Sequence, residues 1–222
     1  MTIDFDNIHS TSDKINKRLK FGSNKHTYMT HVIPEFVEVC TTLNPNLVID
    51  AGCGRNLYKN IIPNLQGFDS GNYEEADFQT TILDANFAKE SADAVISQGV
   101  IHFYSKATIK RNIKQIVDWV RPGGKICMMV NYADDNMLSM LKLTNNKLSV
   151  VPWDLEFLTE VTKENNLTYH TEVWFKDWQF ERRPSNKKFT DIFSKDKNLK
   201  SLWETSSNNL KKMLWIWEKP DV

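Results

Sequence analysis

The sequence has few cysteines, no long apolar run and no excess of charge of either sign. Its three cysteines, Cys40, Cys53 and Cys127, are odd in number and show no Cys-x-x-Cys spacing. This pattern argues against a disulfide framework or a zinc site and fits a reducing compartment. No apolar run approaches the ~18 residues of a membrane span, and residues 1–14 lack the apolar core of a secretory signal. We therefore expect a cytoplasmic protein with no metal site and no membrane association.

Lysine and arginine together number 28, and aspartate and glutamate also number 28, so the formal net charge is zero. This balance argues against binding nucleic acid through bulk charge, although it leaves room for a local basic patch. Residues 181–212 carry nine lysines and arginines against four acids, and residues 1–25 at the N-terminus also contain a basic cluster. With 222 residues, 41% of them apolar, the chain is long enough for one domain with a substantial core.

Short apolar runs in the sequence predict the strands of a sheet. Strands are expected at residues 47–51, 65–69, 80–83, 92–97, 125–130, 168–175 and 214–218. The Arg-Pro-Gly-Gly stretch at residues 121–124 predicts a turn before one of them. Because strands alternate with helical segments, the chain favours a mostly parallel sheet with right-handed crossovers.

Apolar residues at helical spacing predict helices over residues 106–120 and 153–165. A further helix is expected over about 27–43, either kinked at Pro34 or beginning late there. A short helix over 57–62, capped by Asn56 and ended by a proline, is expected after the first strand.

The most informative stretch is Asp-Ala-Gly-Cys-Gly at residues 50–54, where a buried strand runs into two glycines. Glycine has no Cβ, so backbone at this point is able to approach a ligand closely. Asp50 at the end of the strand suits a cationic ligand better than a pyrophosphate. Asp69 ends the next strand, where a carboxylate can accept two hydrogen bonds from a ribose diol. Taken singly, the two glycines also fit an ordinary turn, and Asp69 also fits a solvated acid.

With these residues the chain resembles the class I S-adenosylmethionine-dependent methyltransferases. Residues 50–54 resemble the motif that cradles the methionine end of the cofactor, and Asp69 matches the acid that binds its ribose. Five later stretches resemble, in order, further segments of that family: residues 81–87, 91–98, 121–126, 153–158 and 214–220.

The resemblance implies a Rossmann-like α/β fold with a mostly parallel seven-stranded sheet, an antiparallel C-terminal strand and helices on both faces. It implies S-adenosyl-L-methionine as the cofactor, held by Asp50, Gly52, Cys53, Gly54, Asp69, Ser70, Ile82 and Gln98. We expect an N-terminal arm and capping helix over 1–44. The methyltransferase-like domain is expected over 45–222, with an inserted basic excursion at 176–212.

Three departures from the family pattern stand out. Asn56 replaces a glycine found in many members, which predicts a loop of different shape after Gly54. Thr81 replaces an acid that contacts the adenine amino group. Only about ten residues separate Asp69 from the expected third strand, which leaves little room for the usual crossover helix.

His102 is the candidate general base, because it follows the fourth strand and its ordinary pKa suits proton transfer near neutrality. A loop histidine that orders the start of the next helix is the alternative. Tyr104 is either an acceptor-orienting residue or a packing residue. Asp134 and Asp135 lie near the expected crevice, where turn acids are the alternative reading.

The sequence favours a small-molecule acceptor, or a peptide or protein side chain, over a nucleobase. Residues 97–100 read Ser-Gln-Gly-Val, without the prolines typical of amino-directed nucleic-acid methylases, and no Pro-Cys pair occurs for attack on cytosine carbon. Six of the seven tryptophans follow residue 150, which fits either an aromatic acceptor pocket or simple packing.

Three alternatives remain open at this point. The chain is a non-catalytic S-adenosylmethionine-binding subunit, a methyltransferase that reaches an RNA acceptor through its basic excursion, or a nucleotide-dependent oxidoreductase. The last is disfavoured because Leu57 stands where a dinucleotide loop has its third glycine.

Overall fold

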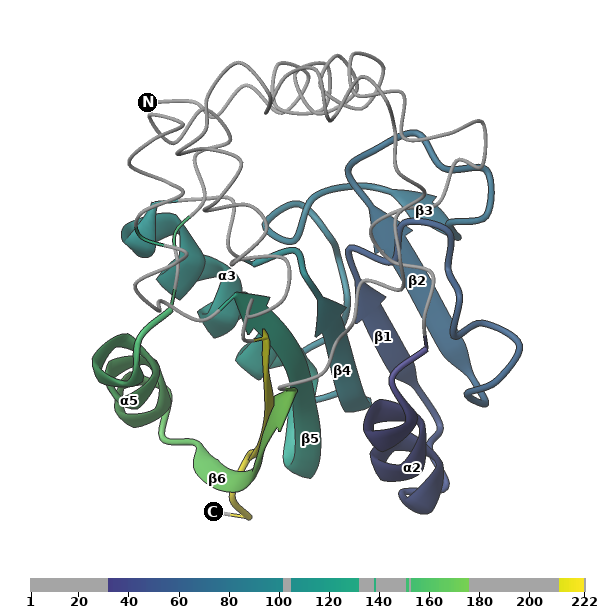
Figure 1. The fold of residues 1–222 in the computed structure, drawn as a ribbon. Coiled ribbons are helices and arrows are strands. Elements are labelled where there is room, and N and C mark those ends of the chain that lie inside the picture. Colours follow the sequence, from purple (N-terminus) through teal and green to yellow (C-terminus); the bar gives the residue numbers. More distant parts are fainter. Residues whose placement is uncertain are drawn as a thin grey trace, which may run out of the picture.

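A computed structural model describes residues 32–101, 105–131, 138, 151, 153–175 and 212–221. Within them the chain forms a seven-stranded sheet in the order β3-β2-β1-β4-β5-β7-β6 (Figure 1). The strands are β1 (Val48–Ala51), β2 (Leu65–Asp69), β3 (Phe78–Gln79), β4 (Ala92–Gln98), β5 (Val120–Asn131), β6 (Thr168–Phe175) and β7 (Lys212–Glu218).

The sheet is parallel except for its C-terminal strand. β1 pairs in parallel with both β2 and β4, and parallel pairs also join β2 to β3 and β4 to β5. β7 lies antiparallel between β5 and β6. The predicted Rossmann-like sheet with one antiparallel C-terminal strand is therefore confirmed. Because β1, β2 and β4 run in the same direction, their carboxyl ends meet at one edge, where such sheets bind ligands.

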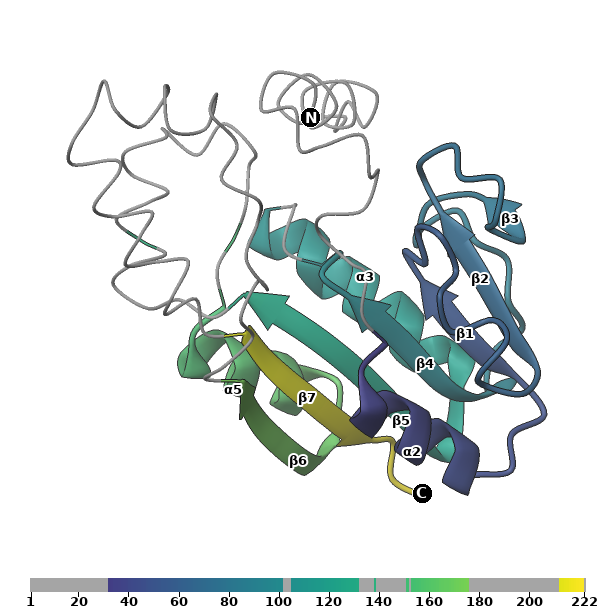
Figure 2. The same ribbon diagram turned by 45° about the vertical axis from the view of Figure 1, so that its right-hand side comes forward.

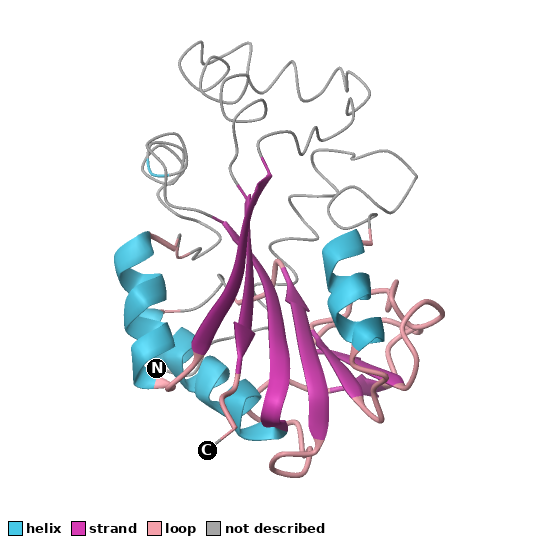
Figure 3. Ribbon diagram, turned by 90° about the horizontal axis from the view of Figure 1, so that it is seen from below, coloured by secondary structure: helices cyan, strands magenta, loops and turns pink. Residues whose placement is uncertain are grey.

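Helices cover both faces of the sheet, as Figure 2 shows and as Figure 3 shows with helices on either side of the strands. α3 (Lys106–Trp119) and α5 (Leu155–Glu164) contribute to one apolar cluster. α2 (Pro34–Thr42) contributes to the second cluster. The central strands supply residues to both clusters, so the core is divided into two layers by the sheet.

Local chemistry explains where the helices begin. Ser105 and Asp154 cap α3 and α5 by accepting hydrogen bonds from the backbone N–H groups of Thr108 (3.2 Å) and Phe157 (2.7 Å). α2 begins at Pro34, directly after an extended Ile33, which selects the late start over the kink. The first part of the expected 27–43 helix lies outside the described residues.

Two predicted elements are wrong. Residues 57–62 form turns instead of a helix, because Asn56 has a φ of 56°, whereas a helix N-cap needs extended backbone. Residues 80–83 are not a strand: the backbone N–H of Ala85 bonds to the Thr81 carbonyl oxygen (2.9 Å) and closes a turn there. The third strand lies just before them, at β3, and no helix occurs in the described connection from β2.

The turn expected at 121–124 lies inside β5 as a bulge. The register moves from Ala92 opposite Val120 to Ala94 opposite Lys125, so four residues of β5 lie opposite one of β4. Asp93 holds this bulge by accepting a hydrogen bond from Arg121 Nε (2.6 Å).

Residues 176–211 of the basic excursion and the arm before residue 32 lie outside the described residues, whereas Lys212 begins β7. The predicted domain boundaries stay predictions. Within the described part of the chain, no helix has the length and apolar character required to span a membrane.

Candidate functional site

The chain leaves β1 through a glycine that no other residue could replace without strain. Gly52 has a φ of 82°, and a Cβ built there would lie 2.3 Å from Val100 Cγ2. The N–H groups of Gly52 and Cys53 both donate to the Phe68 carbonyl oxygen, at 2.8 and 2.9 Å. The first turn is thereby held against the end of β2, which places the next residues beside Asp69.

Gly54 and Asp69 form the open part of this edge. The Gly54 N–H donates to Asp69 Oδ2 (2.9 Å), and the Gly71 N–H donates to Asp69 Oδ1 (2.7 Å). A Cβ built on Gly54 would meet no atom of the described residues within 4 Å, so they leave free space on its side-chain side. A carboxylate has about four lone-pair sites. After two backbone donors are bound, Asp69 therefore retains acceptor capacity for a ligand diol.

Asp50 is a buried carboxyl group at the end of β1. It is 2% exposed and lies in register with Gly67 of β2 and Ile96 of β4. Burial, and secondly the nearby charge of Asp69, raise the pKa of Asp50 to about 8. Among the described residues no donor makes a hydrogen bond to this carboxyl. A cationic ligand beside it would favour its ionised form.

We predict that Asp50→Asn stabilises the ligand-free protein, increasingly so as the pH rises from about 4 to about 8. The unfolded carboxyl ionises near 3.8, whereas the folded one resists ionisation until about 8. The raised pKa therefore costs the wild type stability across this window, and the loss is complete above it. Urea titrations of both proteins at several pH values measure the difference in unfolding free energy; a difference that does not change with pH would contradict this account.

The remaining predicted cofactor residues differ in their surroundings. Burial, and then the charges of Asp50 and Asp69, raise the pKa of the Cys53 thiol, which argues against a thiolate nucleophile there. Gln98 ends β4, and its Oε1 accepts a hydrogen bond from the Tyr58 hydroxyl (2.6 Å). Ser70 begins the turn after β2 and is partly exposed, whereas the Ile82 side chain is buried in the larger core cluster.

Gly71 is a site residue that the sequence reasoning missed. It provides the second backbone donor to Asp69, and a Cβ there would lie 2.8 Å from Tyr73 Cε2. The signal in the sequence that could have indicated it is the spacing, because this glycine follows Asp69 by two residues.

His102, Tyr104, Asp134 and Asp135 lie outside the described residues, so the predicted base stays a prediction. The chain that leads to His102 is anchored, because the Ile101 carbonyl oxygen accepts a hydrogen bond from Trp153 Nε1 (3.2 Å).

Three of the late tryptophans are core residues. Trp153, Trp215 and Trp217 are all at most 5% exposed and belong to the larger apolar cluster. Packing therefore accounts for these three. Over the described residues there is no group of His, Cys, Asp or Glu side chains that could hold a metal ion.

Comparisons with known proteins agree with this geometry. Residues 49–128 match the family described as "Methyltransferase domain". The sequence matches no curated protein. The fold is similar to that of 1,6-didemethyltoxoflavin-N1-methyltransferase from Burkholderia thailandensis, crystallised with S-adenosylhomocysteine. That similarity has a TM-score of 0.63 and 12% identity, and covers 100% of this chain and 92% of the other.

Two further structures share the fold. Geranyl diphosphate C-methyltransferase from Streptomyces coelicolor has a TM-score of 0.57 and 13% identity, over 84% of this chain and 79% of the other. A putative methyltransferase in complex with the Haloferax volcanii Trm112 methyltransferase activator has a TM-score of 0.56 and 16% identity, and each chain is covered completely. Residues 49–128 are thus a methyltransferase domain, within a chain that has the class I methyltransferase fold. The predicted family is confirmed at this level.

Proposed function

We propose that this protein transfers the methyl group of S-adenosyl-L-methionine to a small-molecule acceptor. The observation that carries the proposal is the pair formed by Gly54 and Asp69: open space beside a glycine, and a carboxylate fixed by two backbone donors. The structural neighbours support this reading, because their names specify 1,6-didemethyltoxoflavin and geranyl diphosphate as acceptors.

The residues at this edge fit the cofactor in both shape and charge. Asp69 would accept hydrogen bonds from the ribose hydroxyls, since its remaining lone pairs lie at the end of β2. Gly52 and Gly54 would allow the chain to pass close to the methionine end. Asp50 would ionise beside the positive charge of the cofactor, and its burial would strengthen that attraction.

When bound, the cofactor would supply a sulfonium methyl group: the acceptor's nucleophile would bond to the methyl carbon while the bond from that carbon to sulfur breaks, and S-adenosylhomocysteine would leave. The contribution of the protein is mainly to hold both partners in reacting geometry, which is worth roughly 7–11 kcal/mol of the barrier. His102 would act as the general base: it would take a proton from the nucleophilic group of the substrate, if that group is protonated at the working pH.

A methyl-release assay tests the reaction itself. The protein is incubated with S-adenosylmethionine labelled in the methyl group and with fractionated small molecules, peptides or RNA, and the label is followed into each class. We expect transfer into the small-molecule fraction. Tight binding of the cofactor with no transfer to any fraction would instead indicate a non-catalytic binding subunit.

His102→Ala is predicted to lower turnover by roughly 10²-fold or more while leaving cofactor affinity almost unchanged, because a general base acts on the acceptor and not on the cofactor. The measurements are the pH profile of turnover with the acceptor found above and the dissociation constant of S-adenosylhomocysteine. Wild-type turnover in the variant would assign His102 a structural role.

A further inference from the structure

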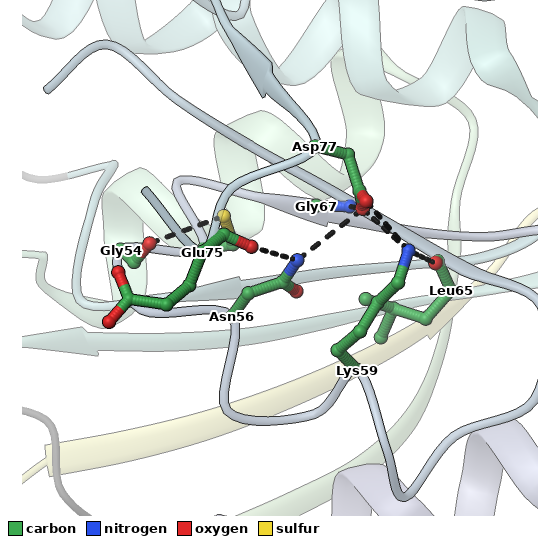
Figure 4. Close-up of polar contacts among 8 residues, drawn as sticks. Gly54, Asn56, Lys59, Leu65, Gly67, Glu75 and Asp77 are labelled. Carbon is green, nitrogen blue, oxygen red and sulfur yellow. Dashed lines mark hydrogen bonds and ion pairs between the residues drawn. The ribbon is translucent and has the colours of Figure 1, made fainter. Parts of the chain in front are cut away.

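A polar network begins in the loop after β1, where the sequence predicts a helix. It joins the loop that follows β1 to the loop between β2 and β3, through the side chains of Asn56, Lys59 and Asp77 (Figure 4). We call these three residues the loop clamp. The first of these loops carries Gly54, and the second begins directly after Asp69, the last residue of β2.

Asp77 is the centre of the loop clamp. Its Oδ2 accepts hydrogen bonds from the Gly67 N–H (2.8 Å), from Lys59 Nζ (2.7 Å) and from Asn56 Nδ2 (3.4 Å). Lys59 Nζ also donates to the Leu65 carbonyl oxygen (2.8 Å). Although partial burial acts to raise the pKa of Asp77, these donors hold it below its usual value, so the group is a carboxylate at neutral pH.

Asn56 fits its place only because residue 67 is glycine. A Cβ built on Gly67 would lie 2.4 Å from Asn56 Oδ1. Asn56 is 5% exposed, has a left-handed backbone, and donates through Nδ2 to the Glu75 carbonyl oxygen (3.0 Å). Its Oδ1 is buried without a hydrogen-bond partner among the described residues. The unsatisfied buried oxygen is a cost that calls for an explanation, whereas the left-handed backbone is one that asparagine adopts readily.

Short stretches of backbone connect the loop clamp to the edge of the sheet where we place the cofactor. Asn56 is two residues after Gly54, and Gly67 is two residues before Asp69. The hydrogen bond from the Gly54 N–H to Asp69 Oδ2 also joins the loop after β1 to the end of β2, next to the proposed cofactor site. We propose that Asn56, Lys59 and Asp77 are positioning residues, which preorganise Gly54 and Asp69 for S-adenosylmethionine in place of the missing helix. This inference rests on the proposed function.

The test is a set of variants measured for S-adenosylhomocysteine affinity by calorimetry. Lys59→Met is expected to weaken binding about fivefold and Asp77→Ala about tenfold or more, since loss of preorganisation appears directly in affinity. The double variant is expected to be no weaker than Asp77→Ala alone, because contacting residues are not additive. Lys59→Arg restores the charge and should recover most of the affinity.

Lys110→Met is the matched control. Lys110 also joins two elements by ion pairs, here α3 to α5 through Glu160 and Glu164 (2.7 Å each), and neither helix carries a predicted cofactor residue. The Lys110→Met variant should bind S-adenosylhomocysteine with the affinity of the wild type. Exposed ion pairs contribute little to stability, so Lys59→Met and Lys110→Met should unfold similarly.

The outcomes separate this inference from the function on which it rests. A wild type that does not bind S-adenosylhomocysteine overturns the proposed function and the inference with it. A wild type that binds, with a folded Lys59→Met variant that binds equally well, overturns the inference alone. If Asp77→Ala does not fold, the comparison of Lys59→Met with Lys59→Arg decides the matter.

Discussion

Replacing Asp69 by alanine is expected to weaken the binding of S-adenosylmethionine and S-adenosylhomocysteine at least tenfold. The carboxylate would hold the ribose diol through charge-assisted hydrogen bonds, worth roughly 1.5–3 kcal/mol each. It also fixes the backbone of Gly54 and Gly71, at 2.9 and 2.7 Å, so its removal loosens both sides of the site. Isothermal titration calorimetry of the folded variant with each ligand measures the loss.

Glu74→Ala is the control for this prediction. Glu74 is an exposed acid on the loop between β2 and β3, so its removal changes the charge of that loop but not the hydrogen bonds of Asp69. Its affinity should remain that of the wild type. Unchanged affinity in Asp69→Ala would mean that Asp69 does not bind the ribose. An equal loss of affinity in both variants would mean that only the negative charge of this region matters, and not the hydrogen bonds of Asp69.

The two glycines of the first turn should respond to alanine in opposite ways. Gly52→Ala is expected to destabilise the fold by about 3 kcal/mol or more, because a left-handed backbone and a close contact with Val100 act together. Gly54→Ala has only the backbone cost, about 1–2 kcal/mol, since its Cβ enters open space. If that space is where the cofactor lies, however, Gly54→Ala should lose most of its affinity for S-adenosylhomocysteine.

Urea unfolding and calorimetry of both variants check this contrast. A Gly54→Ala protein that is folded and binds like the wild type would mean that the space beside Gly54 is not part of the cofactor site. Equal destabilisation in both variants would mean that the contact with Val100 relaxes without cost.

The sheet could be predicted from the sequence because its strands are short, apolar and bounded by turn residues. β2 and β6 have the predicted bounds, and β1, β4, β5 and β7 differ only at their ends. The two elements that failed depend on local backbone that periodicity does not encode. Asn56 takes a left-handed conformation that is stabilised by partners far along the chain. The Thr-Thr-Ile-Leu stretch at residues 80–83 closes into a turn through Thr81.

The site could be predicted only in part. Asp50, Gly52, Gly54 and Asp69 were found because strand ends and glycines carry a local signature, and the structure brings all four to one edge of the sheet. The loop clamp could not be found in this way, because Asn56 and Asp77 are 21 residues apart and nothing in their spacing links them. Asn56 in place of a glycine was visible in the sequence as a departure, but its partner was not.

The decisive experiment is a calorimetric titration of the wild-type protein with S-adenosylhomocysteine, repeated with Gly54→Ala. We expect a single saturable site with micromolar affinity in the wild type, and little or no binding in a Gly54→Ala variant that remains folded. The absence of heat and of any thermal shift with the wild type, at ligand concentrations far above micromolar, would contradict this expectation.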